Sequence, residues 1–100
     1  MGGEPQLTVE ERDDELVLVG ELDIATARQL AAAFERRVAG GHRPIKLNLS
    51  AVTFMDSSGL RVLIDLRQQV EELALVDPSR AVVRLLELAA VDHLFVILPS

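Results

Sequence analysis

Short runs of β-prone residues and a strict alternation of apolar and polar positions predict the first three strands. The runs Leu7 to Val9 and Leu16 to Val19 are separated by a polar stretch in which Asp13 and Asp14 are typical of a turn. We therefore predict an opening hairpin. The third strand is predicted at Ile45 to Leu49, where every second residue is apolar, so one face is expected to be buried.

Apolar residues that recur every three or four positions predict three helices. The first lies between Asp23 and Ala39, with Asp23 at about the N-cap position and Gly40-Gly41 as the stop signal. The second extends from about Ser58 to Val70, and the third from Ala81 to Ala89. The apolar stripe of the first helix consists of Ala27, Leu30, Ala31, Phe34 and Val38.

Two further strands, Leu73 to Val76 and Leu94 to Leu98, complete the order β-β-α-β-α-β-α-β. This alternation predicts an α/β fold with a mixed sheet and helices packed against it. No linker or repeat divides the chain, and 100 residues suffice to bury one core without disulfides. We therefore predict a single domain over residues 1–100, with its core at about 7–98.

Composition excludes several classes of protein. The chain has no cysteine, which excludes a disulfide framework, a zinc-thiolate site and a catalytic thiol, and is consistent with a reducing cytoplasm. No apolar run approaches about 18 residues, so no membrane insertion is expected. Sixteen acidic against ten basic residues give a net charge of −6, which disfavours direct nucleic-acid binding.

The bases cluster between Ile24 and Asn48, after a strongly acidic N-terminal quarter. They allow two interpretations, a solvated surface or a nucleic-acid patch, and the first is favoured. Phe34, Phe54 and Phe95 fall at core-periodic positions, which leaves no aromatic platform for stacked bases. The bases that would form such a patch are Arg36, Arg37, Arg43 and Lys46.

The polar tetrad Asp56-Ser57-Ser58-Gly59 is the strongest candidate for chemistry. It follows a short connection in which Val52 and Phe54 are expected to turn inward, and it opens the second helix. Its first three side chains can cap free backbone N–H groups, and Gly59 would let a partner approach the backbone closely. Because a helix N-terminus favours anions, the fold would tolerate a phosphate on either serine. The plainer interpretation is a helix cap alone.

An enzyme is not expected. A serine nucleophile would need a base, and the two histidines, His42 and His93, accompany no nucleophile motif. The sequence has no pattern for a metal site and no phosphate-binding loop, so no metal and no cofactor are predicted.

Several motifs, in order and spacing, resemble the STAS domain of the anti-sigma factor antagonists. The resemblance rests first on residues 54 to 60, preceded by Leu47-Asn48-Leu49 and by Gly20-Glu21-Leu22-Asp23. Further along, residues 76 to 79, 84 to 88 and 92 to 95 are similar to the C-terminal third of the family. The similarity covers about residues 7–98.

This resemblance implies a bacterial protein that switches partners. In its unphosphorylated form, such a protein binds an anti-sigma factor that is also a serine kinase of the GHKL type, and so frees a sigma factor. The kinase phosphorylates the first serine of the motif, which is Ser57 here, and a PP2C-type phosphatase reverses the reaction. Asp56 is then a capping and electrostatic neighbour, and Asp23 a contact or support residue. Ser58 is expected to cap the helix, with the role of phosphoacceptor as its alternative.

The chain departs from the family pattern near the expected partner surface. Gln68 to Glu72 continues directly into Leu73, which predicts a shorter second helix without a glycine C-cap. Ala89-Ala90-Val91 replaces the more usual Thr-Gly-Leu, as a packing variation. Arg61 stands where many relatives have glycine, either as a solvated side chain or as a specificity contact. The alternative function is a STAS subunit or scaffold of another assembly, such as a lipid-transport ABC complex or a stress-signalling complex.

Overall fold

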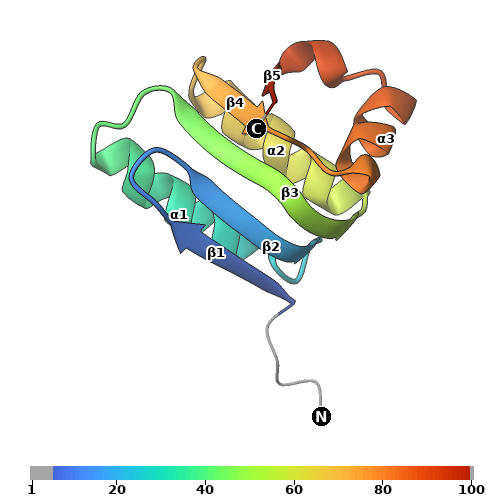
Figure 1. The fold of residues 1–100 in the computed structure, drawn as a ribbon, viewed down its shortest axis with the longest axis horizontal. Helices are drawn as coiled ribbons and strands as arrows, with labels where there is room; N and C mark the ends of the chain where they lie inside the picture. Colours follow the sequence, from blue (N-terminus) through green and yellow to red (C-terminus); the bar gives the residue numbers. More distant parts are fainter. Residues whose placement is uncertain (1–5, 100) are drawn as a thin grey trace.

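The strands and helices follow one another in the predicted order (Figure 1). The computed structural model describes residues 6–99; residues 1–5 and 100 of the predicted domain lie outside this description. A 3₁₀ helix, η1, which the hydrophobic pattern did not predict, precedes the last strand. The elements are β1 (Leu7–Glu11), β2 (Leu16–Leu22), α1 (Ala27–Ala39), β3 (Ile45–Met55), α2 (Ser57–Gln69), β4 (Leu73–Val76), α3 (Arg80–Leu88), η1 (Asp92–Leu94) and β5 (Val96–Leu98).

The strands form one mixed sheet in the order β1-β2-β3-β4-β5. The pair β1 and β2 is antiparallel, which confirms the hairpin, and β2 to β5 run parallel. The carboxyl ends of the parallel strands therefore share one edge of the sheet. At that edge Leu22, the last residue of β2, pairs with Met55, the last residue of β3.

Helices α1 and α2 cover one face of the sheet, and α3 packs beside the last part of β3 (Figure 1). Leu30 and Phe34 of α1 and Leu63 of α2 are buried against this face. In the part of the chain that the structure describes, no helix combines the length and apolarity needed to cross a bilayer. Among the strand residues of this core, those at most 1% exposed include Leu16, Leu18, Ile45, Leu47 and Leu49.

The strand β3 is longer than predicted, because residues after Leu49 continue to pair with β2 as far as Met55. The register between the two strands shifts twice, and each shift places an extra residue in β3. Val52 is 1% exposed, so the prediction that it turns inward is confirmed. The same prediction is wrong for Phe54, which is 46% exposed, because the second shift turns Met55 inward in its place.

The helix boundaries differ from prediction mainly at the start of α1. Its N-cap is Thr26 rather than Asp23, because a turn closed by the bond from the Ala27 N–H to the Asp23 carbonyl precedes the helix. The C-terminal end of α2 lacks a glycine cap as predicted, and Val70 leaves the helix in extended conformation. Phe34 and Phe95 are buried as predicted.

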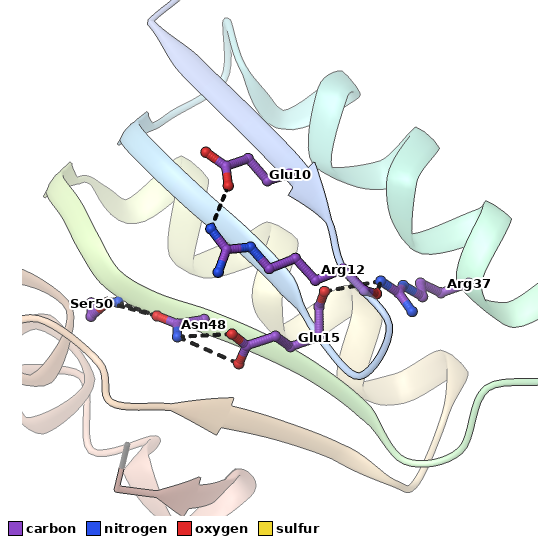
Figure 2. Close-up of polar contacts among 6 residues, drawn as sticks. All are labelled: Glu10, Arg12, Glu15, Arg37, Asn48 and Ser50. Carbon is purple, nitrogen blue, oxygen red and sulfur yellow. Dashed lines mark hydrogen bonds and ion pairs between the residues drawn. The ribbon is translucent and has the colours of Figure 1, made fainter.

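Arg37 is buried, so the interpretation of this base as solvated surface is wrong. Figure 2 shows its guanidinium reaching from α1 to the turn between β1 and β2. It donates to the carbonyls of Arg12, of Asp13 at 3.2 Å and of Glu15 at 2.9 Å. A cation that binds three carbonyl groups cannot serve a nucleic-acid patch.

The neighbouring Arg36 stays at the surface. Its guanidinium forms an ion pair of 2.7 Å with the Glu11 carboxylate, and this hydrogen-bonded contact lowers the pKa of Glu11. Two adjacent arginines of α1 therefore have different roles, one in the core of the hairpin turn and one on the surface.

A chain of polar contacts crosses the face of the sheet that α1 and α2 leave uncovered (Figure 2). The amide of Asn48 donates to the Glu15 carboxylate at 3.3 Å, and its carbonyl oxygen accepts from the Ser50 hydroxyl at 2.7 Å. The carboxylate of Glu15 thus lies on this face while its backbone carbonyl binds Arg37. The contacts satisfy side chains that point outward from β3.

Candidate functional site

The sheet register brings the two predicted acidic site residues to the same edge. Asp23 follows Leu22 and Asp56 follows Met55, and these two strand residues are partners in the ladder between β2 and β3. Neighbouring strands lie about 4.8 Å apart, so the two segments leave the sheet side by side. The proximity of Asp23 to the Asp56 tetrad therefore follows from the pairing of two parallel strands.

Asp56 is the N-cap of α2, as predicted. Its Oδ1 atom accepts hydrogen bonds from the backbone N–H of Ser58 at 2.9 Å and of Gly59 at 3.1 Å. Its extended backbone, with φ −111° and ψ −173°, is the conformation that lets an N-cap side chain reach the first turn. Two N–H groups at this helix end are consequently already satisfied.

Ser58 does not cap the helix, so that prediction is wrong. It is the second residue of α2, and within residues 6–99 its hydroxyl forms no hydrogen bond. The reason is positional, because the capping side chain must come from the residue that precedes the helix, and Asp56 already occupies that place. The side chain of Ser58 is half-buried.

Ser57 is the first residue of α2, and its side chain is exposed. Among the described residues no group forms a hydrogen bond with its hydroxyl. It opens onto a shallow groove of about 430 Å³ along the outer face of α2. This groove is lined by Ser57, Leu60, Arg61, Ile64, Asp65 and Gln68. Ser57 is therefore the serine of the tetrad that another protein can reach most readily.

Gly59 is buried, and its lack of a side chain lets α2 lie against the end of β2. A Cβ atom at this position would stand 2.3 Å from the carbonyl oxygen of Leu22 and 2.8 Å from the Cγ atom of Met55. The close neighbour is thus the chain itself, and the expectation that Gly59 admits a partner is wrong. The glycine instead fixes the distance between the tetrad and the turn that begins at Asp23.

The carboxylate of Asp23 organises the turn between β2 and α1. Its Oδ1 atom accepts from the backbone N–H of Ala25 at 3.0 Å and of Thr26 at 3.2 Å. The buried hydroxyl of Thr26 donates to the Glu21 carbonyl at 2.9 Å. The intervening Ile24 is left 80% exposed. Asp23 therefore supports the local backbone and holds an apolar side chain at the surface.

Three exposed apolar side chains surround this edge of the sheet, and sequence reasoning missed all of them. Ile24 lies in the turn after β2, and Phe54 lies near the end of β3. Leu88 of α3 is 75% exposed and lines a second groove, of about 280 Å³, together with Phe54. The available signal was that Leu88 lies off the buried side of α3, which is formed by Val82 and Leu86, whereas Ile24 gave no such signal because its spacing continues the apolar stripe of α1. An exposed apolar group beside polar residues is typical of a protein-binding surface.

Neither histidine belongs to this edge. His42 lies before β3, at the opposite end of that strand from Ser57, and His93 lies in η1. Within residues 6–99, no group of three histidine, aspartate or glutamate side chains is placed to hold a metal ion. The chemistry of the edge is therefore that of an exposed hydroxyl, two carboxylates and an apolar rim.

Comparisons with known proteins agree on one family. The model of the STAS domain matches residues 5–100. An anti-sigma-B factor antagonist of Staphylococcus aureus is 30% identical over 93 residues, which are 89% of this chain and 86% of that protein. An anti-sigma factor antagonist from Mycobacterium paratuberculosis has a similar crystal structure, with a TM-score of 0.76, 30% identity, and coverage of 94% of this chain and 85% of that one.

A structure with lower sequence identity has the same fold. The Bacillus cell fate determinant SpoIIAA in its phosphorylated form aligns with a TM-score of 0.64 at 20% identity, over 94% of this chain and 90% of that one. At this identity the likeness is one of fold.

Proposed function

The chain belongs to the STAS domain family and is related to its anti-sigma factor antagonists. We therefore propose that it is a regulatory protein whose binding to a partner is controlled by phosphorylation of Ser57. The unphosphorylated protein binds an anti-sigma factor, which is also a serine kinase of the GHKL type, and thereby frees a sigma factor. Phosphorylation of Ser57 ends that interaction, and a PP2C-type phosphatase restores it. The proposal includes a cytoplasmic location, because sigma factors act in the cytoplasm.

The observation that carries this proposal is the exposure of the Ser57 hydroxyl, which forms no hydrogen bond with any described residue and lies beside a rim of exposed apolar side chains. A kinase needs an accessible hydroxyl, and a protein partner gains affinity from burying apolar surface. Ser58, the alternative acceptor, is the second residue of the helix, and its side chain is half-buried. The geometry therefore favours Ser57.

Charge explains how a phosphate at this position would expel a partner. A phosphoserine carries about −1.5 to −2 charges at neutral pH. The edge already holds the carboxylates of Asp23 and Asp56, and Asp56 occupies the N–H groups of Ser58 and Gly59. The phosphate cannot use these two N–H groups without displacing Asp56. Much of its charge would thus face the docked partner, where repulsion and desolvation oppose binding.

Two substitutions at Ser57 test the proposal. Ser57→Ala should still capture the anti-sigma factor from a lysate of the source organism but take up no phosphate from ATP. Ser57→Glu, which adds a permanent charge, should bind at least about tenfold more weakly, or about 1.4 kcal/mol. The measurements are affinity by calorimetry and incorporation of labelled phosphate by the captured kinase.

Ser58→Ala is the matched control, because it removes the neighbouring hydroxyl without changing charge. It should be phosphorylated like the wild type. Phosphate uptake by Ser57→Ala would contradict the assignment of the acceptor. Capture of membrane-transport ATPase subunits, without a kinase, would contradict the anti-sigma function and support the alternative of a STAS subunit in a transport complex.

A further inference from the structure

Arg61 lies one helical turn after Ser57, on the same face of α2. Both residues line the groove of about 430 Å³ described above, and Asp65 follows one turn later. Residues four positions apart on a helix are neighbours on its surface. The Arg61 side chain is exposed, and within residues 6–99 it forms no ion pair or hydrogen bond, not even with Asp65. Its guanidinium is therefore available to another anion.

A phosphate on Ser57 would find the backbone N–H groups of the next three residues already engaged. Asp56 accepts from the N–H groups of Ser58 and Gly59, and its carbonyl oxygen accepts from the Leu60 N–H at 3.0 Å. The strongest remaining source of positive charge for a phosphate is a side-chain cation, and among the groove residues Arg61 is that cation. An anion placed four residues before a cation has the more favourable orientation of such helical pairs, and a guanidinium can bind a phosphate through two parallel hydrogen bonds.

We infer that Arg61 binds the phosphate of phosphorylated Ser57 within the same helix, an inference that rests on the function proposed for Ser57. Phosphorylation then changes two charges on the groove. It adds the negative charge of the phosphate. It also neutralises the positive charge of the Arg61 guanidinium, which in the unphosphorylated protein is free to bind a partner. Arg61 is thus a positioning residue for the phosphorylated state, and a partner with a carboxylate opposite Arg61 loses that contact when Ser57 is modified.

The test uses full-length protein with phosphoserine incorporated at position 57 during translation, so that no kinase is needed. Phosphorus NMR follows the titration of the phosphate, whose second pKa is normally about 6. A neighbouring guanidinium favours the dianion and lowers this pKa. We expect the phosphate pKa to be about 0.3 lower in the wild type than in Arg61→Gln, the value that corresponds to a helical ion pair. The difference should shrink at about 1 M salt, where the screening length falls to about 3 Å.

Arg43→Gln is the matched control, since it removes the same charge from another exposed arginine. Arg43 precedes β3, whose eleven residues separate it from the edge that holds Ser57. This strand spans roughly 35 Å, well beyond the screening length of about 10 Å at 0.1 M salt. The phosphate pKa in Arg43→Gln should equal that of the wild type.

An equal phosphate pKa in the wild type and Arg61→Gln would overturn the inference, as would an equal rise in Arg61→Gln and Arg43→Gln. Neither result depends on the capture of a partner. Conversely, failure of Ser57 to accept phosphate from a kinase would overturn the proposed function while the titration still decided whether Arg61 binds a phosphate at this position.

Discussion

At each end of strand β3 a charged side chain binds backbone polar groups, but the two side chains have opposite charges and different exposure. Each end leaves backbone polar groups without partners in the regular structure, and at each end one charged side chain binds them. Near the start of β3, the guanidinium of Arg37 donates to three carbonyls of the hairpin turn. After its last residue, the carboxylate of Asp56 accepts from two N–H groups of α2.

The difference between these ends lies in exposure. Arg37 is 6% exposed, so its guanidinium is buried against the hairpin turn. Asp56 is half-buried, and the residue after it, Ser57, presents its hydroxyl to solvent. A charged cap can therefore either complete the core or hold a reactive group at the surface, and the surrounding packing determines which of the two occurs.

Removing the buried cap should have the largest effect on stability. Arg37→Met keeps the apolar stem but removes the charged donor from three carbonyls of the turn, of which that of Glu15 still accepts from the Arg12 N–H at 2.9 Å. Hydrogen bonds from a charged group contribute about 1.5 to 3 kcal/mol. We expect a loss of about 3 kcal/mol in the free energy of unfolding, measured by urea denaturation. Arg36→Met, the control, removes an exposed ion pair, which solvent screens, and should therefore cost much less than Arg37→Met. Equal losses in the two variants would mean that burial of Arg37 does not matter.

The close contact at the Ser57 end should produce the next largest effect. In Gly59→Ala the added Cβ would meet the Leu22 carbonyl oxygen at 2.3 Å, so the helix and the end of β2 must move apart. We expect a destabilisation of roughly 2 kcal/mol, the middle of the range for overpacked sites. The adjacent Ser58→Ala should change stability by less than about 0.5 kcal/mol. A tolerated alanine at 59 would contradict the contact with Leu22.

Loss of the partly exposed cap should have the smallest of the three effects. Asp56→Ala removes the acceptor for two N–H groups, and substitution of an N-cap by alanine typically costs about 1 kcal/mol. Asp56→Asn keeps an acceptor at the same place without the charge and should cost little. The free energies of unfolding of Asp56→Ala and Asp56→Asn, measured by thermal and urea denaturation, separate the contribution of the capping hydrogen bonds from that of the charge. If asparagine were as costly as alanine, the charge of Asp56 rather than its capping geometry would be what stabilises α2.

Much of the candidate site could be predicted because it depends on local patterns. The alternation at Ile45 to Leu49 and the helical spacing after Ser57 are visible in the sequence, and both elements are present. The position of Asp56 directly before a helix indicates an N-cap, and the structure confirms it. Parallel strands then require that Asp23 and Asp56 share an edge.

The errors at Phe54, Arg37 and Gly59 have a common cause, since each depends on residues distant in sequence. Phe54 points outward because β2 shifts register against β3, and no local pattern in β3 reports this. Arg37 resembles any exposed arginine of a helix until the hairpin turn provides three carbonyls for it. Gly59 could be assigned to a partner only as long as Leu22, thirty-seven positions earlier, was not known to touch it.

Local patterns in the chain were enough to predict the order of strands and helices and the position of the serine motif at a helix start, because periodicity and capping act over a few neighbouring residues. The STAS family was indicated by the order and spacing of several motifs. The tertiary structure alone decided which of those residues are accessible. Exposure depends on contacts between distant segments: the packing of α2 against the end of β2 buries Gly59, and the hairpin turn buries Arg37, while Ser57, Arg61 and Ile24 stay at the surface.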